Sequence, residues 1–469
     1  MSTLLSQKPS APPDLPARSA EQPQDTRPLG GVRFDSRQRR EALVWSLWDG
    51  ILGAAMIALV ETFAVAAAVK LKAPAMVIAM LGSLPLLVGS LLQLVSPLLV
   101  TARRTRRLLV VWAVVIQALF VLAAGLSGCL PGALAVAAYL VAFTLYGSTG
   151  NAVSNLWMSW MADLVPASVR GRLFAWRGRI FGAVSLCCSL LAGLLARRYT
   201  SDTAPWEFFT IVFSVAGVLR LSCAWCLTRQ HEPPPQPVGD RGAFPRMSRE
   251  FVIFAIASAL LNGSASMAGP FFGVWFLRDL HFSYFTLAVC SCATTIGSMA
   301  SLPLWGRLAD TVGNRRVMQM TAFMTALVPL PYLASEAPHM IWLFNFYSGI
   351  AWAGYSISSF NFMLSAAGTD RPERAISYAA AATGIAVFLF GLLGGWLATR
   401  LPVFWTYQLR SVFGLSGLLR LFVVLVLFRM LGRIEMTLPP HMLDMLNELP
   451  GYRLGVGLVR STFRAFRRQ

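Results

Sequence analysis

The chain is poor in charge, and above all in acidic residues. Only 13% of its 469 residues are charged, and 21 Asp and Glu stand against 40 Lys and Arg. Hydrophobic residues make up 56% of the chain. Average soluble domains hold about 25% charged residues, so this composition excludes an ordinary soluble globular protein. The sequence predicts a protein that lies mostly within a membrane.

Residues that enzymes use for chemistry are also scarce. The four histidines, His231, His281, His339 and His441, fall in predicted loops, linker or tail, and none stands beside a nucleophile. The seven cysteines lie almost entirely inside apolar runs, so we interpret them as small packing residues. We find no phosphate-binding loop and no metal-ligand cluster. The sequence therefore predicts a protein that is not an enzyme and holds neither a cofactor nor a metal.

Long apolar runs are abundant. A helix needs about 20 apolar residues to cross a bilayer, and the chain has room for about twelve. We predict six spans in residues 42–228 and six in 250–430, joined by a Pro-rich cytoplasmic linker at 229–249. Residues 1–41 are predicted to be disordered and show no signal-peptide core. Residues 431–469 are a cytoplasmic tail, for which an amphipathic surface helix and a disordered basic segment are the alternatives.

Arginine clusters alternate with loops that hold few basic residues. This positive-inside pattern predicts that both termini are cytoplasmic, and it argues against a nucleic-acid surface. Since Arg dominates over Lys and we see no targeting signal, we expect the inner (plasma) membrane of a bacterium. The clusters lie at Arg103, Arg104, Arg106 and Arg107, at Arg170 and Arg172, at Arg315 and Arg316, and at Arg371 and Arg374.

The two halves contain related segments. FSVAGVLRL at 213–221 aligns with FGLSGLLRL at 413–421, so Arg220 and Arg420 occupy equivalent positions. Six predicted spans separate the copies, and both run in the same sense along the chain. This predicts a parallel repeat of two six-helix bundles. We expect both arginines to have structural rather than transport roles.

The segment WGRLADTVGNRR, residues 305–316, has the chemistry of a tight turn between two spans. Gly306 would let two helix backbones approach closely, and Gly313 can take a positive φ to reverse the chain. Asp310 can pair with a neighbouring cation. Arg315 and Arg316 would hold the loop on the cytoplasmic side.

Its pattern, G-x-L-A-D-x-x-G-x-R-R, resembles the signature loop of the Major Facilitator Superfamily, a family of 12-helix secondary transporters. DLVPASVRGR at 163–172 resembles a second loop of that family, matched by Asp163 and Arg170. The resemblance implies an all-α membrane protein with 12 transmembrane helices in two pseudo-symmetric six-helix bundles. It also implies that the loop around Asp310 latches the two halves together.

The corresponding loop of the first half departs from the family pattern. In PLLVTARRTRR at 97–107, Pro97, Thr101 and Arg104 replace the expected Gly, Asp and Gly. We therefore expect this latch to be weak and the Asp310 latch to matter more. Arg177 and Arg179, at the start of the fifth span, are candidate partners for Asp310, with a lipid-headgroup contact as the alternative.

Two carboxylates fall inside the first predicted span. Asp49 and Glu61 lie on helix faces roughly 120° apart, so they cannot aim at one spot. Intramembrane charges usually face a cavity or a partner, which makes both residues candidates for proton coupling. For Asp49 the alternative is a wetted or Arg-paired carboxylate, and for Glu61 it is a position near the outer surface close to Lys70.

Polar residues recur on one face of the fourth, seventh and tenth spans, which line the central cavity in the family. We predict that this face forms the substrate site, with helix–helix hydrogen bonding as the alternative. The candidate cavity residues are Ser148, Asn151, Asn155, Asn262, Ser266, Trp352, Tyr355 and Ser359.

Amides, hydroxyls and aromatic rings suit a neutral or cationic organic molecule, such as a sugar-like ring or an amphipathic drug-like compound. We therefore predict a monomeric permease that moves a small organic solute by alternating access as a proton symporter or antiporter. Its partners would be the solute, membrane lipids and protons, not nucleic acid. The alternative is a receptor or scaffold that kept the fold and lost transport, which the degenerate first-half loop supports.

Overall fold

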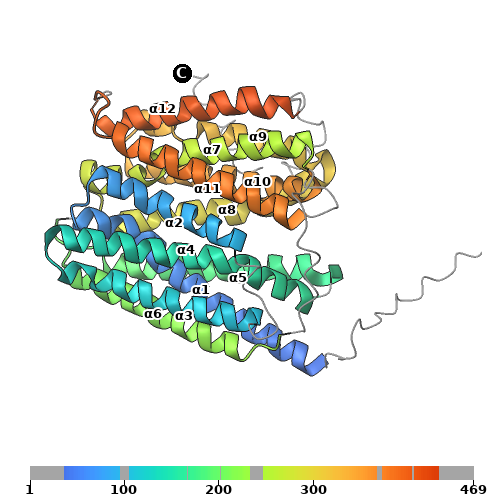
Figure 1. The fold of residues 1–469 in the computed structure, drawn as a ribbon. Helices are drawn as coiled ribbons and strands as arrows, with labels where there is room; N and C mark the ends of the chain where they lie inside the picture. Colours follow the sequence, from blue (N-terminus) through green and yellow to red (C-terminus); the bar gives the residue numbers. More distant parts are fainter. Residues whose placement is uncertain are drawn as a thin grey trace, which may run out of the picture.

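Twelve α-helices account for most of the described chain, which comprises residues 36–95, 105–165, 167–200, 202–232, 247–366, 372–403 and 406–431 of a computed structural model (Figure 1). The helices are α1 (Ser36–Lys70), α2 (Ala75–Val95), α3 (Arg106–Leu126), α4 (Gly132–Leu164), α5 (Ala167–Leu195), α6 (Trp206–Thr228), α7 (Arg249–Val274), α8 (Tyr284–Val312), α9 (Asn314–Leu327), α10 (Pro338–Ala366), α11 (Pro372–Leu397) and α12 (Gln408–Val423).

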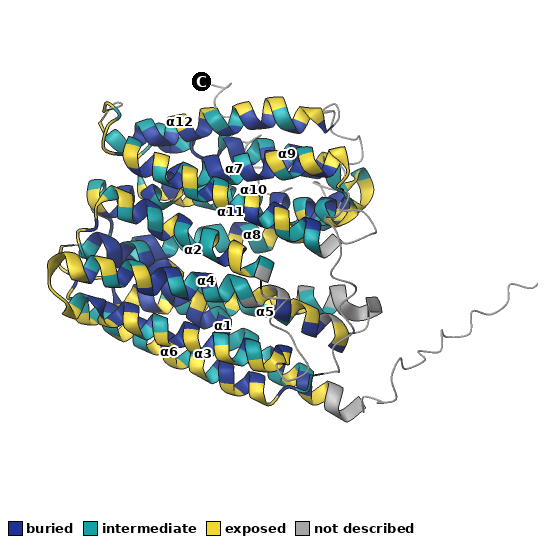
Figure 2. Cartoon of the chain, in the orientation of Figure 1, coloured by how far each residue is buried: buried dark blue, intermediate teal, exposed yellow. Residues whose placement is uncertain are grey.

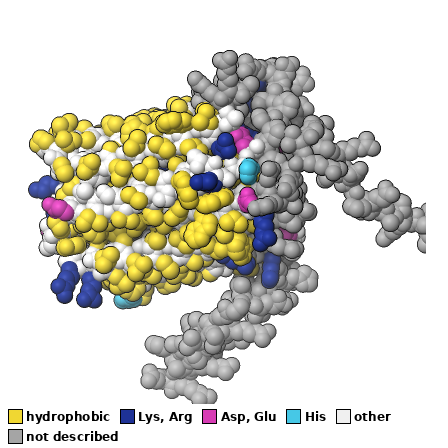
Figure 3. Space-filling model, turned by 90° about the horizontal axis from the view of Figure 1, so that it is seen from below, with side chains coloured by type: hydrophobic (Ala, Val, Ile, Leu, Met, Phe, Trp, Pro, Cys, Tyr) yellow, Lys and Arg dark blue, Asp and Glu magenta, His cyan; other side chains and the backbone are white. Residues whose placement is uncertain are grey.

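Ten of these helices are long and apolar enough to cross a membrane; α9 and α10 are the two that do not meet both conditions. Figure 3 shows a flank covered by hydrophobic side chains, with charged groups gathered toward its two ends. Exposed tryptophans occur near helix ends, for example Trp225 and Trp396, each about half exposed. Such aromatic belts are typical of the two membrane–water interfaces. The predicted all-α membrane fold is confirmed.

The helices form two groups that follow the chain. In the first half, α1 packs on α5 and α6, α4 packs on α2 and α3, and α3 packs on α6. In the second half, α7 packs on α11 and α12, and α10 packs on α8 and α9. The seam between the halves is formed mainly by α2 against α11 and by α5 against α8. Figure 2 shows buried residues between the helices and exposed ones along their outer sides.

The helices run between two ends of the bundle. We call the end where α1 begins and α6 ends the terminal end, and the end where α1 stops at Lys70 the far end. Residue 36 already belongs to α1, so the helix starts six residues before the predicted boundary at 42. Of the segments predicted to be disordered, linking or tail-like, residues 1–35, 233–246 and 432–469 lie outside the described residues.

The ninth helix is shorter than the other eleven. α9 ends at Leu327, and a single 3₁₀ turn, Pro331–Leu333, follows. Pro329 and Pro331 lack the N–H that an α-helix needs, so the helix breaks instead of bending.

The internal repeat is visible in side-chain contacts. The Arg220 Nε donates to Gln117 Oε1 of α3 at 2.6 Å. The Arg420 Nη1 donates to the carbonyl of Thr325 in α9 at 3.1 Å. The repeated arginine therefore joins the last helix of each half to the third, the structural role that the sequence predicted.

Glycines let the two halves approach closely along the α2–α11 seam. A Cβ added at Gly391 would lie 2.8 Å from the Ser83 Cβ, and one at Gly395 would lie 2.9 Å from the Ala79 Cβ. Both separations are shorter than ordinary side-chain contacts. Small residues at such positions allow backbones to pack, which stabilises helix pairs in membranes.

Candidate transport pathway

The far end of the seam is closed by aromatic side chains. Tyr284, the first residue of α8, is fully buried among rings of the first half. Its ring centroid lies 6.1 Å from that of Phe63, 5.8 Å from Phe208 and 5.6 Å from Phe209. The Tyr284 N–H also donates to the Tyr199 carbonyl at 3.1 Å. The two halves therefore meet at the far end in a dry, tightly packed cluster.

Toward the terminal end, the facing surfaces of α1 and α7 separate. At the far end, a Cβ on Gly273 would lie 3.0 Å from Cγ1 of Val65. One and two turns closer to the terminal end on the same face of α1, Glu61 and Ile57 are exposed. One turn from Gly273 on α7, a Cβ on Gly269 would meet nothing within 4 Å. A hollow therefore opens between the halves below the Val65–Gly273 contact.

Glu61 lies in the wall of this hollow. Its side chain is solvent-accessible although α1 is surrounded by apolar helices. The Tyr146 hydroxyl of α4 is 3.4 Å from Glu61 Oε1, a long hydrogen bond across the first half. Placed one turn from the contact between the halves, this carboxylate would be covered if the hollow closed.

Asp49 occupies a different environment. It is buried inside the first half, and the guanidinium groups of Arg220 and Arg177 are the charges that act on it. Arg177 is anchored by Ser46, donating to its hydroxyl at 2.6 Å and to its carbonyl at 3.0 Å. Asp49 is therefore the arginine-associated carboxylate of the alternative interpretation, and it does not face the hollow.

The basic loop of the first half is bound within its own half. Arg106, at the start of α3, lies 2.7 Å from Asp163 of α4 and 3.2 Å from Glu232 just beyond α6. The Glu232 carboxylate also accepts the backbone N–H groups of Arg106 and Arg107 at 3.0 Å each. It therefore caps the positive end of the α3 helix dipole.

The basic loop of the second half is bound in the same manner. Arg315 pairs with Glu250 of α7 at 2.7 Å and lies over the ring of Phe362 in α10. Asp310 is exposed, and no described residue pairs with it. Arg177 does not serve as its partner, because its guanidinium donates to Ser46 instead, and this expectation was wrong.

The two glycines of the segment 305–316 differ in their backbone conformation and surroundings. Gly313 has φ +90° between α8 and α9, as the turn required. Gly306 does not sit at a close helix contact, because a Cβ there would meet nothing within 4 Å. The side chain of Arg316 is exposed. The side chain of Arg170 lies outside the described residues.

Several predicted cavity residues are instead used between helices. Ser148 is fully buried, and its hydroxyl donates to the carbonyls of Thr144 and of Pro85 in α2. Asn151 packs against Gly89 of α2, where an added Cβ would lie 2.6 Å from its own. For these two residues of α4, helix–helix packing is the correct interpretation, since their side chains face α2 and not the hollow.

The same correction applies to Ser266. Its hydroxyl donates to the Val387 carbonyl of α11 at 2.7 Å, which joins α7 to α11. Ser359 donates to the carbonyl of Ser356 in its own helix. The side chain of Asn155 lies outside the described residues.

Three predicted residues do come together in the second half. The Tyr355 hydroxyl of α10 donates to Ser258 of α7 at 2.9 Å, and Asn262 of α7 also interacts with that hydroxyl. Trp352 meets Tyr355 edge-on at 5.9 Å. Asn262 and Trp352 are partly exposed, whereas Tyr355 is buried. This cluster offers an amide and an indole on helices that flank the hollow.

Sequence reasoning missed the tyrosines of α4. Tyr146 approaches Glu61, and Tyr139 donates to the Ala64 carbonyl of α1 at 2.8 Å. Their spacing of seven residues places both on one helix face. That spacing was available as a signal, but the Ser and Asn pattern on α4 concealed it.

A family model described as Major Facilitator Superfamily matches residues 254–442. No curated protein sequence matches the chain. The fold is similar to solved structures of membrane transporters over most of the chain. The second half of the chain therefore matches the Major Facilitator Superfamily model, as the loop at 305–316 led us to expect.

Among the solved structures, a mutant of the nucleoside transporter NupG superposes with TM-score 0.66 at 11% identity, covering 83% of this chain and 100% of that chain. The inward-open xylose transporter XylE from E. coli gives TM-score 0.64 at 13% identity, covering 87% and 99%. A bacterial homologue of the iron transporter ferroportin in an inward-facing state gives 0.60 at 14% identity, covering 86% and 100%. At these identities the similarity establishes the fold alone.

Proposed function

We propose that this protein is a transporter of the Major Facilitator Superfamily that couples the movement of a small organic solute to that of a proton, with Glu61 as the proton-binding group. The observation that carries the proposal is the position of Glu61. It is accessible from the hollow, lies one turn from the contact between the halves, and receives a hydrogen bond from Tyr146.

Closure of the hollow explains the coupling. If the halves rocked together at the terminal end, Glu61 would lose its water. Burying an unpaired carboxylate costs several kcal/mol, whereas its neutral form costs much less. Closure would therefore require Glu61 to take up a proton or to face a cationic solute. Asp49, the second candidate, is inside the first half with two arginines, so we assign it a structural role.

The character of the solute follows from the opposite wall. Asn262 and Trp352 offer an amide and an indole, and the described parts of α1, α4, α7 and α10 carry no basic residue in mid-span. These groups suit a polar ring-shaped molecule bound by hydrogen bonds and stacking. The names of two structural neighbours, a nucleoside and a xylose transporter, support the same class.

The positions of the basic residues indicate which end of the bundle faces the cytoplasm. Arg106, Arg107, Arg315 and Arg316 all lie at the terminal end, so we place that end and both termini in the cytoplasm of a bacterial cell. The structure then represents an inward-open monomer. Alternating access would open the aromatic cluster around Tyr284 and bring Asp310 into contact with the first half.

The test starts by finding the solute. Thermal-shift screening against sugars, nucleosides, amino acids and drug-like cations would identify a ligand, and proteoliposomes with an imposed proton gradient would measure its accumulation. We expect Glu61→Gln to abolish proton-driven accumulation while counterflow persists. The matched control Glu207→Gln changes a carboxylate at the far end of α6 and should behave as wild type.

Two results would count against the proposal. Proton-driven accumulation that survives in Glu61→Gln would exclude Glu61 as the coupling group. Ligand binding without any counterflow in the wild-type protein would favour the receptor or scaffold alternative.

A further inference from the structure

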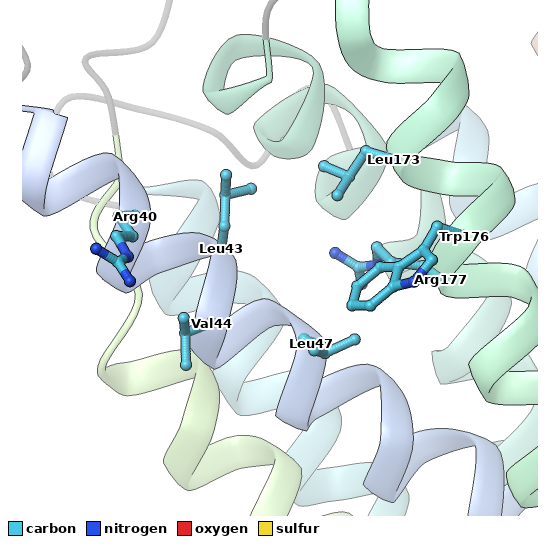
Figure 4. Close-up of a pocket in the computed structure, with 7 residues that line it drawn as sticks. All are labelled: Arg40, Leu43, Val44, Leu47, Leu173, Trp176 and Arg177. Carbon is cyan, nitrogen blue, oxygen red and sulfur yellow. The ribbon is translucent and has the colours of Figure 1, made fainter.

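A groove on the outer side of the first half lies between α1 and α5 near the terminal end. It encloses about 400 Å³ and is lined by Arg40, Leu43, Val44 and Leu47 of α1 and by Leu173, Trp176 and Arg177 of α5. Figure 4 shows the α1 side chains along one side and the α5 side chains along the other.

The depth of the groove matches the membrane interface. Trp176 and Val44 in its lining are each about half exposed. Trp48, one turn beyond Val44, is exposed as well. Exposed tryptophans mark the level of lipid headgroups. The groove therefore opens sideways toward the lipid of the leaflet at the terminal end.

The chemistry of the groove is that of a receptor for an amphiphile. Its walls are aliphatic or aromatic, and its only charged lining groups are guanidinium groups. Arg40 is exposed at the mouth, while Arg177 forms part of the floor, where Asp49 offsets some of its charge.

A second groove provides an internal comparison. It lies between α1, α5 and α6 toward the far end, and it is also apolar, with Leu59, Leu191 and Phe208 among its lining residues. Its charged lining residue is Glu207, and it contains no Lys or Arg. Two lipid-facing grooves on one flank therefore differ chiefly in the sign of their charge.

From this contrast we propose that the α1–α5 groove binds an anionic phospholipid of the terminal-end leaflet. The phosphate would lie at Arg40, and an acyl chain would pack against Leu43, Val44 and Leu47. Free phosphate would gain nothing from the apolar walls, which is why we assign the site to a lipid. The bound lipid would brace α1 against α5, the helix that packs on α8 across the seam.

The experiment is native mass spectrometry of the full-length protein in detergent with phosphatidylglycerol or phosphatidylcholine. One basic residue at a membrane surface contributes about 1 kcal/mol toward an anionic lipid, or about fivefold in affinity. We expect wild type to retain phosphatidylglycerol in preference to phosphatidylcholine. Arg40→Gln should lower that preference about fivefold, and Val44→Trp should fill the groove and reduce binding of both lipids.

The matched control is Arg229→Gln. Arg229 lies at the same end, just after α6, but it stacks on Trp225 at 5.5 Å and is outside the groove. It should bind both lipids as wild type does. Thermal unfolding of each variant confirms that it is folded, and Val44 is exposed enough to accept a larger side chain.

Three outcomes would overturn the proposal. Equal retention of the two lipids by wild type would leave only unspecific solvation of the flank. Unchanged preference in Arg40→Gln would remove the charge argument. Displacement of phosphatidylglycerol by inorganic phosphate at matched concentration would show that the site recognises free phosphate.

Discussion

The two ends of the molecule hold the halves in opposite ways. At the far end, Tyr284 of the second half is buried among Phe63, Phe208 and Phe209 of the first, with no charged group in the cluster. At the terminal end, Arg106 and Arg315 are each bound to carboxylates of their own half. One end is closed by packing between halves, and the other is arranged by charges within each half.

This difference shows how the protein can stay open at one end without leaving charges uncompensated. Because the loop arginines are satisfied inside each half, the open conformation costs little electrostatic energy. Asp310 is the exception, since it is exposed and has no partner among the described residues. It is therefore free to bind the first half when the terminal end closes.

The largest expected effect comes from the charges inside the first half. Asp49→Asn would leave Arg177 and Arg220 without the buried carboxylate whose charge acts on them. Uncompensated charge in a protein interior costs several kcal/mol, so we expect a clear loss in the free energy of unfolding, measured by denaturant titration in micelles.

Asp310→Asn is the matched control for that change, because this carboxylate is exposed. It should leave the free energy of unfolding unchanged and slow transport instead. Equal stability of Asp49→Asn and wild type would contradict the assignment of Asp49 to a structural cluster.

The next effect tests the closed end. Tyr284→Ala removes a fully buried ring, and such truncations cost about 3 kcal/mol or more. We expect destabilisation of that order and a higher reactivity of the far end toward membrane-impermeant reagents. Phe360→Ala changes an aromatic residue of α10 that is half exposed, and it should have little effect. Similar losses in both variants would mean that the aromatic cluster does not close the far end.

Substituting two glycines should change the stability of the protein by smaller amounts and in opposite directions. Gly395→Ala places a Cβ 2.9 Å from Ala79 across the seam and should destabilise the protein by about 1–2 kcal/mol. A Cβ at Gly306 would have no atom within 4 Å. Gly306→Ala should therefore stabilise α8 by roughly 0.5–1 kcal/mol, because Ala has a higher helix propensity than Gly. Thermal unfolding measures both. Destabilisation by Gly306→Ala would indicate that another contact forms there.

The smallest effect concerns the exposed ion pair. Arg315 and Glu250 are 39% and 60% exposed, so water screens their 2.7 Å contact. Glu250→Gln should cost less than about 1 kcal/mol, and the difference from wild type should vanish at high salt. A larger loss that persists in salt would show that this pair stabilises the terminal end more than its exposure suggests.

Much of the fold followed from sequence because hydrophobic length and repetition determine it. The apolar runs gave the helices, and the repeated arginine indicated equivalent contacts, which Arg220 and Arg420 make in α6 and α12. Gly313 was predicted from the turn that it must make, and its φ is +90°. These features depend on local chemistry that a sequence displays.

The site was harder to predict because a polar residue has the same spacing whether it faces water or a neighbouring helix. Ser148 and Ser266 bond to carbonyls of α2 and α11, and only the packing of those helices decides this. Asp49 and Glu61 were correctly separated by their angle on α1. Asp49 lies near arginines of α5 and α6, whereas Glu61 faces the hollow. Both helices lie far from α1 in the sequence, so this difference could not be predicted.

The central claim is that the halves pivot, so that the terminal end closes as the far end opens, under control of Glu61. Distances between spin labels measure this most directly. One pair, Met158→Cys and Leu364→Cys, lies near the terminal ends of α4 and α10, and the other, Leu134→Cys and Met340→Cys, lies near their far ends. All four positions are exposed, and the seven native cysteines would be replaced.

Double electron–electron resonance at acidic and at alkaline pH would compare the two pairs. We predict that acidification shortens the terminal-end distance and lengthens the far-end distance, and that Glu61→Gln shows the acidic pattern at both pH values. Distances that do not respond to pH, or that respond equally in Glu61→Gln, would contradict the account.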